Sequence, residues 1–407
     1  MSISHLVLPP SNNHVTVRMV DTTALLAVPT GWLAEPVQAG HNALNLPCVA
    51  FMIEHELSGK KVMFDFGCRV DYWNYPDIVL KTVWKLKGLK VEKATSDVLK
   101  DCGVSLDSIS SVIWSHYHWD HTGDMSLLPP STEVVVGPGF KSSPALLPGF
   151  PKNTHSPVCA SDFEGRTLRE IDFSDTGLHI GGFSAYDFFG DGSFYLLDTP
   201  GHCLGHICGL ARTTAGPDST FLLLGGDICH FIGQIRPTVA TPFPDEIPAT
   251  ALDSSDPPYF PIPCPCSLFS DNHPIVPSSD SRDDNKRRTT PFYRVAQGEQ
   301  SQYENPPMAQ HSVDKLVEFD SSPSVFVCIA HDPGLLKHLP TLNADRNLSL
   351  NNWKVEGWKE ACRWDWLNEL PRNGRPGRKS VVEGFWREGK PWEDGPQELR
   401  KKGERAT

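Results

Sequence analysis

Residues 115–123 of this chain read SHYHWDHTG, and they place three histidines and one aspartate within six positions. A short strand is predicted just before them. In extended backbone, His116 and His118 point the same way, because side chains alternate with a period of two. Asp120 and His121 follow in a turn and can face a second position. Imidazole and carboxylate groups are ligands that zinc accepts, so this cluster predicts a metal site where a strand ends.

Four ligands cannot complete two metal positions, so more are expected at the ends of later strands. The chain has three such places, in each of which a predicted apolar strand is followed by a ligand residue. The strand 194–198 is followed by His202, the strand 221–224 by Asp227, and the strand 325–330 by His331. Together these strand ends predict a site at one edge of a sheet structure.

The predicted strands form two sets, before and after about Gly190. Strands are expected at 15–20, 48–57, 61–65, 111–115, 133–136, 194–198, 207–211, 221–224 and 325–330, and helices at 77–86 and 97–102. Two sets of strands with helices between and around them indicate a sandwich of two sheets with helices outside.

This pattern resembles the metallo-β-lactamase superfamily. Its HxHxDH signature and later ligands match, in order, His116, His118, Asp120, His121, His202, Asp227 and His331. The stretch Phe64–Gly67 resembles the family's early Asp-x-Gly element, in which Asp65 would orient a metal ligand. The resemblance covers about residues 15–336. It implies an α/β fold, the αββα sandwich of two mixed β-sheets with helices on the outer faces.

The resemblance also implies two zinc ions per chain. One ion would be held by His116, His118 and His202, the other by Asp120, His121 and His331, and Asp227 would bridge them. A hydroxide that bridges the ions would attack a substrate carbonyl, and Asp120 would pass a proton to the leaving atom.

Finer details favour a substrate class. The Pro-Gly-His-x-x-Gly-His pattern at 200–206 looks most like the N-acyl homoserine lactonase branch, and the stretch 226–231 looks like fungal relatives that open benzoxazolinone lactams. We therefore expect a hydrolase that opens a small cyclic ester or cyclic amide, with a role in xenobiotic degradation. Bacterial lactonases carry a catalytic tyrosine three residues after the bridging aspartate, where this chain has His230. His230 is either a catalytic hydrogen-bond donor or a packing residue, and His206 is expected to be structural.

The alternative is a thioesterase or glyoxalase-like hydrolase of a thioester. Substrates of those enzymes carry phosphopantetheine or glutathione, which usually require basic residues near the mouth of the site. The segment after His331 is rich in aromatic residues instead, and its basic residues lie mostly in the tail.

Composition excludes other partners. The chain has 407 residues and a net charge of -12, and only residues 286–288 form a short basic patch, beside two aspartates. Nucleic acid requires clustered Lys and Arg, so a small molecule is the expected partner.

No apolar run approaches about 18 residues, so no membrane span is predicted. The first 13 residues lack the pattern of a secretory signal, which favours a cytoplasmic protein without a disulfide framework. The sequence favours no oligomeric state.

The predicted catalytic domain spans residues 1–345. Two regions differ from it in composition, an insertion within it and the segment that follows it. The stretch of about 241–310 is rich in Pro, Ser and Asp and predicts a long, partly disordered surface insertion, either a lid or a spacer. It contains Cys264 and Cys266, a weak metal-binding pair. Residues 346–407 are expected to form an amphipathic helix at 352–370, with four tryptophans, and a loose polar tail from Arg372.

Overall fold

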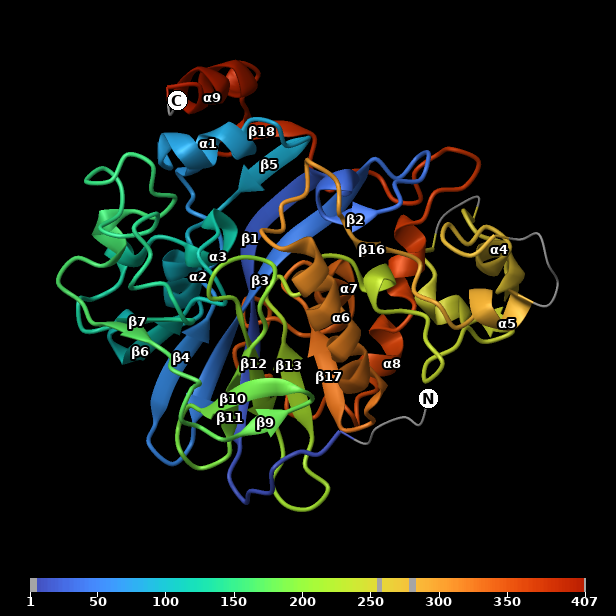
Figure 1. Cartoon of the computed structure of the whole chain (residues 1–407), viewed down its shortest axis with the longest axis horizontal. Coiled ribbons are helices and arrows are strands. Elements are labelled where there is room, and N and C mark those ends of the chain that lie inside the picture. The colour runs from blue at the N-terminus through green and yellow to red at the C-terminus, as the bar shows by residue number, and fades with distance from the viewer. Residues whose placement is uncertain (1–5, 255–257, 278–282, 406–407) are drawn as a thin grey trace.

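Two large β-sheets pack face to face at the centre of the molecule (Figure 1). The structure is a computed structural model that describes residues 6–254, 258–277 and 283–405. Within these residues the larger sheet has nine strands and the smaller has six. Both sheets mix parallel and antiparallel pairs. The predicted α/β sandwich of two mixed sheets is confirmed.

The larger sheet has the order β19 (Lys390–Pro391), β18 (Gly384–Arg387), β5 (Gly88–Val91), β1 (Val15–Pro29), β3 (Ala43–His55), β4 (Lys60–Phe64), β6 (Ile109–Ile113), β7 (Glu133–Val136) and β8 (Leu168–Glu170). The smaller sheet has the order β17 (Val325–Cys328), β13 (Phe221–Leu224), β12 (Ile207–Arg212), β11 (Phe194–Asp198), β10 (Phe183–Asp187) and β9 (His179–Ile180).

Consecutive residues of β13 point to opposite faces of the smaller sheet. Leu222 and Phe326 pack inward with Phe64 of the larger sheet. Leu223, the next residue after Leu222, packs outward with Phe319 of α6 (Pro306–Ser321), which covers this face. Since side chains alternate along a strand, these apolar runs are buried on both faces. On the outer face of the larger sheet lies α2 (Thr95–Asp101), and α1 (Asp77–Val83) packs beyond β5.

The division of strands at Gly190 was wrong in detail. β9 and β10 lie before Gly190 but belong to the smaller sheet, whereas β18 and β19 come from the far end of the chain and join the larger one. The strands that belong to a different sheet from the one predicted all lie at sheet edges. Local composition there carries little information on which strand will be the pairing partner.

The C-terminal segment differs from its prediction in two ways. The single helix expected over 352–370 is replaced by α8 (Trp358–Cys362) and a 3₁₀ turn at Asp365–Glu369, because Gly357 adopts a left-handed conformation with φ of 70° just before α8. The tail from Arg372 is not loose within the described residues. β18 pairs in parallel with β5, and α9 (Gly395–Gly403) packs on α1, as the top of Figure 1 shows. The domain boundary at residue 345 stays a prediction.

The insertion at 241–310 packs around aromatic residues. Phe243, Phe269 and Phe292 are buried and contact one another's rings or those of Trp366. Two short helices, α4 (Ser267–Ser270) and α5 (Asp284–Arg287), form the yellow lobe at the right of Figure 1. Its residues 255–257 and 278–282, part of the stretch predicted to be disordered, lie outside the described residues, as do residues 1–5 of the start that lacks a signal pattern.

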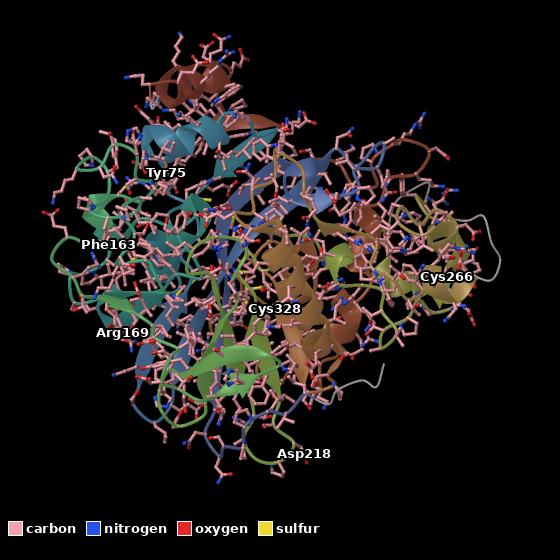
Figure 2. All side chains as sticks on the ribbon, viewed as in Figure 1. Tyr75, Phe163, Arg169, Asp218, Cys266 and Cys328 are labelled. Atoms are coloured by element: carbon pink, nitrogen blue, oxygen red, sulfur yellow. The ribbon has the colours of Figure 1, made fainter. Side chains whose placement is uncertain are left out.

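All 11 cysteines are free, and most are buried. Figure 2 labels Cys266 in the lobe of the insertion, well away from Cys328 at the end of β17. None of the clusters of metal-binding side chains found in the described residues contains Cys264 or Cys266. Among the helices the structure describes, none is long and apolar enough to cross a membrane.

Candidate metal centre

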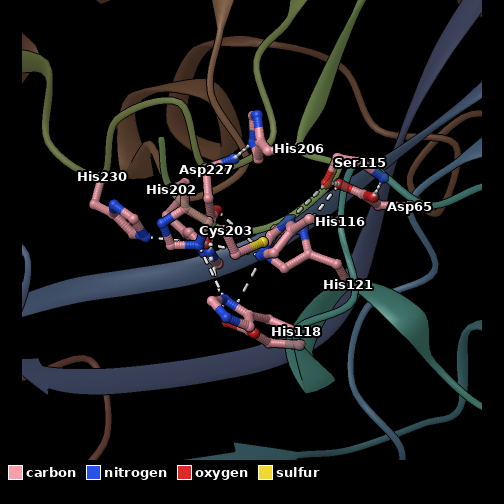
Figure 3. Close-up of polar contacts among 12 residues, drawn as sticks. Asp65, Ser115, His116, His118, His121, His202, Cys203, His206, Asp227 and His230 are labelled. Carbon is pink, nitrogen blue, oxygen red and sulfur yellow. Dashed lines mark hydrogen bonds and ion pairs between the residues drawn. The ribbon is translucent and has the colours of Figure 1, made fainter. Parts of the chain in front are cut away.

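The predicted ligands come from four places that the sheets bring to one edge. β6 runs into the turn that holds His116 and His118, and α3 (Trp119–Thr122) follows. His202 lies in the connection between antiparallel β11 and β12. Asp227 and His331 follow β13 and β17, which pair in parallel, so these two strand ends lie side by side. Figure 3 shows the side chains of His116, His118, His121, His202, His230 and Asp227 pointing toward one another.

A first group consists of His116, His118 and His202. His202 Nε2 lies 2.9 Å from His118 Nδ1 and 3.4 Å from Asp227 Oδ2. His116 Nε2 lies 3.6 Å from the same carboxylate oxygen. The thiol of Cys203 lies within 4.8 Å of the ligand atoms of all three histidines. These three histidines are the set that the resemblance assigns to one ion; His116 and His202 lie near Asp227 Oδ2, and His118 contacts His202.

A second group consists of Asp120, His121 and His331. The Nε2 atoms of His121 and His331 lie 3.9 Å and 3.6 Å from Asp120 Oδ2. They also lie 3.1 Å and 3.0 Å from Asp227 Oδ1. The two oxygens of Asp227 thus face different groups, which is the arrangement that a bridging carboxylate requires.

Several buried polar atoms of this cluster lack hydrogen-bond partners. They are His116 Nε2, His121 Nε2, His331 Nε2, His202 Nδ1 and Asp227 Oδ1. Buried polar atoms are normally paired, so atoms left without partners that face one another need an explanation. Imidazole nitrogens and a carboxylate are ligands of divalent zinc, and a bound cation would satisfy the atoms that face this space. The residues present therefore fit a metal centre.

The far sides of the ligand rings are held by the protein. Asp65 Oδ2 accepts a hydrogen bond from His121 Nδ1 at 2.9 Å, and the same carboxylate accepts bonds from the backbone N–H and hydroxyl of Ser115. His331 Nδ1 donates to the carbonyl oxygen of Pro47 at 3.0 Å. These bonds leave the Nε2 atoms of both histidines free to face the cluster.

Asp65 occupies an uncommon backbone conformation. Its φ of 63° lies in the left-handed region, which aspartate tolerates better than most residues. Its backbone N–H donates to Ile113 at the end of β6. The turn after β4 is thereby tied to the strand that leads into the histidine cluster.

Asp227 is positioned through its backbone. His206, expected to be structural, accepts a hydrogen bond from the Asp227 N–H at 3.0 Å through Nε2, while its Nδ1 contacts Thr199. Gly226 has a φ of 49°, and a Cβ there would lie 2.7 Å from the Ser115 Cβ. Glycine therefore lets the Asp227 loop lie against the histidine turn.

The pKa values of the cluster depend on which groups lie near a carboxylate. Burial lowers the pKa of His116 well below its ordinary value, and neighbouring histidines lower it further. Burial acts in the same direction on His121, but nearby carboxylates, Asp227 foremost, raise its pKa well above the ordinary value. Burial alone would raise the pKa of Asp227, yet the surrounding histidines, His121 foremost, hold it well below the usual range. Asp227 therefore stays ionised and favours a cation beside it.

His230 lies beside the cluster and lines the pocket in front of it. Its Nε2 is 2.9 Å from Asp227 Oδ2, and its Nδ1 is 2.7 Å from the hydroxyl of Tyr303. His230 is also one of the residues whose ligand atoms lie close to those of His202 and Asp227. The structure thus places this predicted residue beside the ligand groups and in the lining of the pocket.

The pocket has a volume of about 260 Å³. Its base carries His118, Asp120, His202, Asp227, His230 and His331. Its walls are mostly apolar and include Leu26, Val28, Trp32, Leu33, Leu46, Ile78, Val79 and Leu86. Among the described residues that line it there is no Lys or Arg. Trp119 also lines the pocket. It was not predicted as a site residue, although its position between His118 and Asp120 in the signature could have indicated that it lies at the site.

The sequence left open whether the insertion is a lid or a spacer, and it did not identify the residues at its end that contact the site. Residues 302–305, here called the strap, run across the ligand loops. The N–H groups of Gln302, Glu304 and Asn305 donate to the carbonyls of Trp32, His202 and Gly201 at 2.9, 2.8 and 3.0 Å. The Glu304 carboxylate accepts hydrogen bonds from the Tyr117 hydroxyl and the Leu204 N–H. No local pattern signals this role.

Comparisons with known proteins agree with this geometry. The sequence model of the metallo-beta-lactamase superfamily matches residues 44–213. The chain is 39% identical over 392 residues to gamma-lactamase FDB1 of Fusarium pseudograminearum, covering 93% of this chain and 89% of that protein. It is 46% identical over 216 residues to gamma-lactamase MBL2 of Gibberella moniliformis, covering 52% of this chain and 87% of that protein.

A solved structure shares the fold. It is a mutant of AiiA from B. thuringiensis with N-decanoyl-L-homoserine bound, which matches with a TM-score of 0.50 and 15% identity, covering 81% of this chain and 98% of that one. Because full-length identity to a fungal relative reaches 39%, the chain belongs to the metallo-β-lactamase superfamily and is a hydrolase of the lactamase and lactonase type.

Proposed function

We propose that this chain is a dinuclear zinc hydrolase that opens a small cyclic amide or cyclic ester. One observation carries the proposal. Buried ligand atoms without partners converge at the base of an apolar pocket, and Asp227 faces both ligand groups. The gamma-lactamase name of the relative that matches 93% of the chain favours the cyclic amide.

Each ligand group would hold one zinc ion, with Asp227 shared between them. When bound, the two ions would supply Lewis acidity and lower the pKa of a water molecule toward neutrality. The protein contributes the fixed ligand geometry, because Asp65 and the Pro47 carbonyl orient the rings of His121 and His331.

Two side chains are placed to handle protons. Asp120 lies in the pocket with its carboxylate 12% exposed, so it can accept a proton and release it to the leaving atom. His230 presents Nε2 to the same space, next to Asp227. A departing amide nitrogen must be protonated, whereas an alkoxide leaves more readily. We therefore assign Asp120 as the proton carrier and His230 as the hydrogen-bond donor.

The pocket favours a neutral, compact substrate. Its walls offer Trp32, Leu46 and Ile78 to an apolar ring, and none of the described lining residues is Lys or Arg. Phosphopantetheine and glutathione carry negative charges, which would find no Lys or Arg partner in these walls. The pocket therefore supports the lactam or lactone reading over a thioesterase.

A substrate panel tests the proposal. Zinc-loaded protein would be assayed on benzoxazolinone, an N-acyl homoserine lactone and a glutathione thioester, with zinc counted by atomic absorption. We expect two zinc ions per chain and a kcat/KM on a cyclic substrate at least about tenfold above that on the thioester, which corresponds to about 1.4 kcal/mol. A preference for the thioester, or fewer than one zinc per chain, would contradict it.

A further inference from the structure

The strap places a tyrosine behind His230. Tyr303 is 4% exposed and its hydroxyl lies 2.7 Å from His230 Nδ1. Its ring contacts the rings of His230 and His202 edge-on, with centroids 5.3 and 5.1 Å apart. Tyr303 is not among the residues that line the pocket, so it touches His230 from the side opposite the reaction space.

The backbone of His230 is held separately from its ring. The N–H groups of His230 and Phe231 both donate to Gln234 Oε1, at 2.9 and 3.0 Å. The His230 ring stacks on His331, with centroids 5.9 Å apart and an interplanar angle of 9°. The remaining variable is which ring nitrogen carries the proton.

The two hydrogen-bond partners of the ring settle that variable. Asp227 Oδ2 is a carboxylate oxygen and only accepts, so Nε2 must donate to it. In a neutral imidazole the other nitrogen is then an acceptor, and the phenol hydroxyl, which can donate or accept, donates to it. Asp227 therefore selects the tautomer, and Tyr303 holds Nδ1 of the same ring from the opposite end.

The position of the Tyr303 hydroxyl does not depend on its own hydrogen bond. The residues on both sides, Gln302 and Glu304, are fixed by backbone bonds to Trp32 and His202. Asn305 accepts a bond from the Met308 N–H and caps α6. A phenylalanine at position 303 would thus keep the same place and lose the donor to His230 Nδ1 and the hydrogen bond with the Gln234 side chain.

We propose that Tyr303 is a positioning residue that donates a hydrogen bond to His230 Nδ1 and so holds the ring with Nε2 toward Asp227 and the pocket. The insertion accordingly completes the catalytic site, in addition to covering the surface. This inference rests on the proposed function only for its kinetic readout, because the hydrogen bond at His230 Nδ1 can be measured on the protein itself.

The substitution Tyr303→Phe tests the proposal. We expect kcat on benzoxazolinone to fall about 10- to 100-fold, the usual effect of losing a partner that orients a catalytic ring, with zinc content unchanged. Combined with His230→Gln, the Tyr303→Phe change should have little further effect, because both act through one group. Wild-type kcat in Tyr303→Phe, or independent, additive losses in the double variant, would overturn the proposal.

The chain offers a matched control. Tyr293 lies in the same insertion, is fully buried, and its hydroxyl lies 2.6 Å from Nδ1 of another buried histidine, His41. His41 does not line the pocket. Tyr293→Phe should therefore cost similar stability and leave kcat unchanged. A kcat loss in Tyr293→Phe equal to that in Tyr303→Phe would assign the effect to packing and overturn the proposal.

Nitrogen NMR gives the readout that does not need turnover. In protein labelled with ¹⁵N-histidine, the His230 signal is identified by its loss in His230→Gln. We expect the Nε2-protonated tautomer in the zinc-loaded wild type and, in Tyr303→Phe, a shift of the Nδ1 resonance because its hydrogen-bond donor is lost. An unchanged Nδ1 resonance in Tyr303→Phe would overturn the proposal. If the wild type turned over no panel substrate, the proposed function would fail, and this measurement would still decide the role of Tyr303.

Discussion

The histidine turn at 116–121 and the strap at 302–305 face the same pocket but are held there in different ways. The turn follows β6, which pairs in parallel with β4 and β7 on its two sides, and its ligand rings are oriented by side chains such as Asp65. The strap has no helix or strand of its own and is fixed by backbone hydrogen bonds to the loops it crosses. Ligand geometry therefore depends on the sheets, whereas the pocket wall depends on the ligand loops being in place.

The largest effect is expected where both ligand groups depend on one side chain. Asp227→Asn keeps the shape but removes the charge that faces both groups, so turnover should fall at least about 1,000-fold and zinc content should drop. Atomic absorption and a turnover assay measure this. Asp191→Asn, which alters a carboxylate paired with His55 away from the pocket, is the control. Full zinc content in Asp227→Asn would break the assignment of Asp227 as the shared ligand.

A smaller loss is expected behind the turn. Asp65→Asn keeps the size of the side chain but weakens its bond to His121 Nδ1. Zinc affinity or kcat should fall about 10- to 100-fold, as is usual for partners of metal-binding histidines. Competition with a chromophoric chelator measures the affinity. Wild-type affinity together with wild-type kcat would mean that the turn holds its geometry without Asp65.

A milder change is expected in the strap. Glu304→Ala removes the acceptor for Tyr117 and Leu204. Each such bond contributes about 1 kcal/mol, so KM should rise by roughly three- to tenfold while zinc content stays the same. Hydrogen exchange at residues 302–305 should quicken in step. Loss of zinc in Glu304→Ala would show that the strap also holds the ligands. Ligand geometry would then not depend on the sheets alone.

The smallest effect on turnover is expected in the C-terminal tail. Leu399 of α9 is fully buried, so Leu399→Ala should lower the free energy of unfolding by about 2 kcal/mol. Zinc content and kcat should be unchanged, since none of the residues of α9 lines the pocket. Urea denaturation and the standard assay measure the two quantities. A kcat loss above about threefold would mean that the tail supports the site, because that exceeds 0.6 kcal/mol.

The sequence predicts best those elements that local patterns determine. The bounds of β7, β11 and β13 are as predicted, because these strands are apolar on both faces and end at turns. The eight side chains predicted at the site, the seven ligands and His230, lie together, because each follows a strand or belongs to one dense motif. Their roles as ligands and as a donor stay predictions.

The misses involve partners far away in sequence. Nothing near residue 303 indicates that Tyr303 lies against His230, 73 residues earlier. The pairing of β18 with β5 joins residues nearly 300 positions apart, in a segment whose own composition is polar. The prediction of one helix over 352–370 was wrong at Gly357. It relied on the spacing of the tryptophans and gave too little weight to a glycine at which the chain turns.

The absence of Lys and Arg among the described residues that line the pocket bears on how a turnover ends. A neutral ring would enter these apolar walls without Coulombic cost. Opening it creates a carboxylate, and the walls offer that new charge no Lys or Arg, within a protein of net charge -12. The proposed zinc ions would then be the positive charges nearest to the carboxylate, so release of the opened molecule would depend on how readily water replaces it at the metal centre.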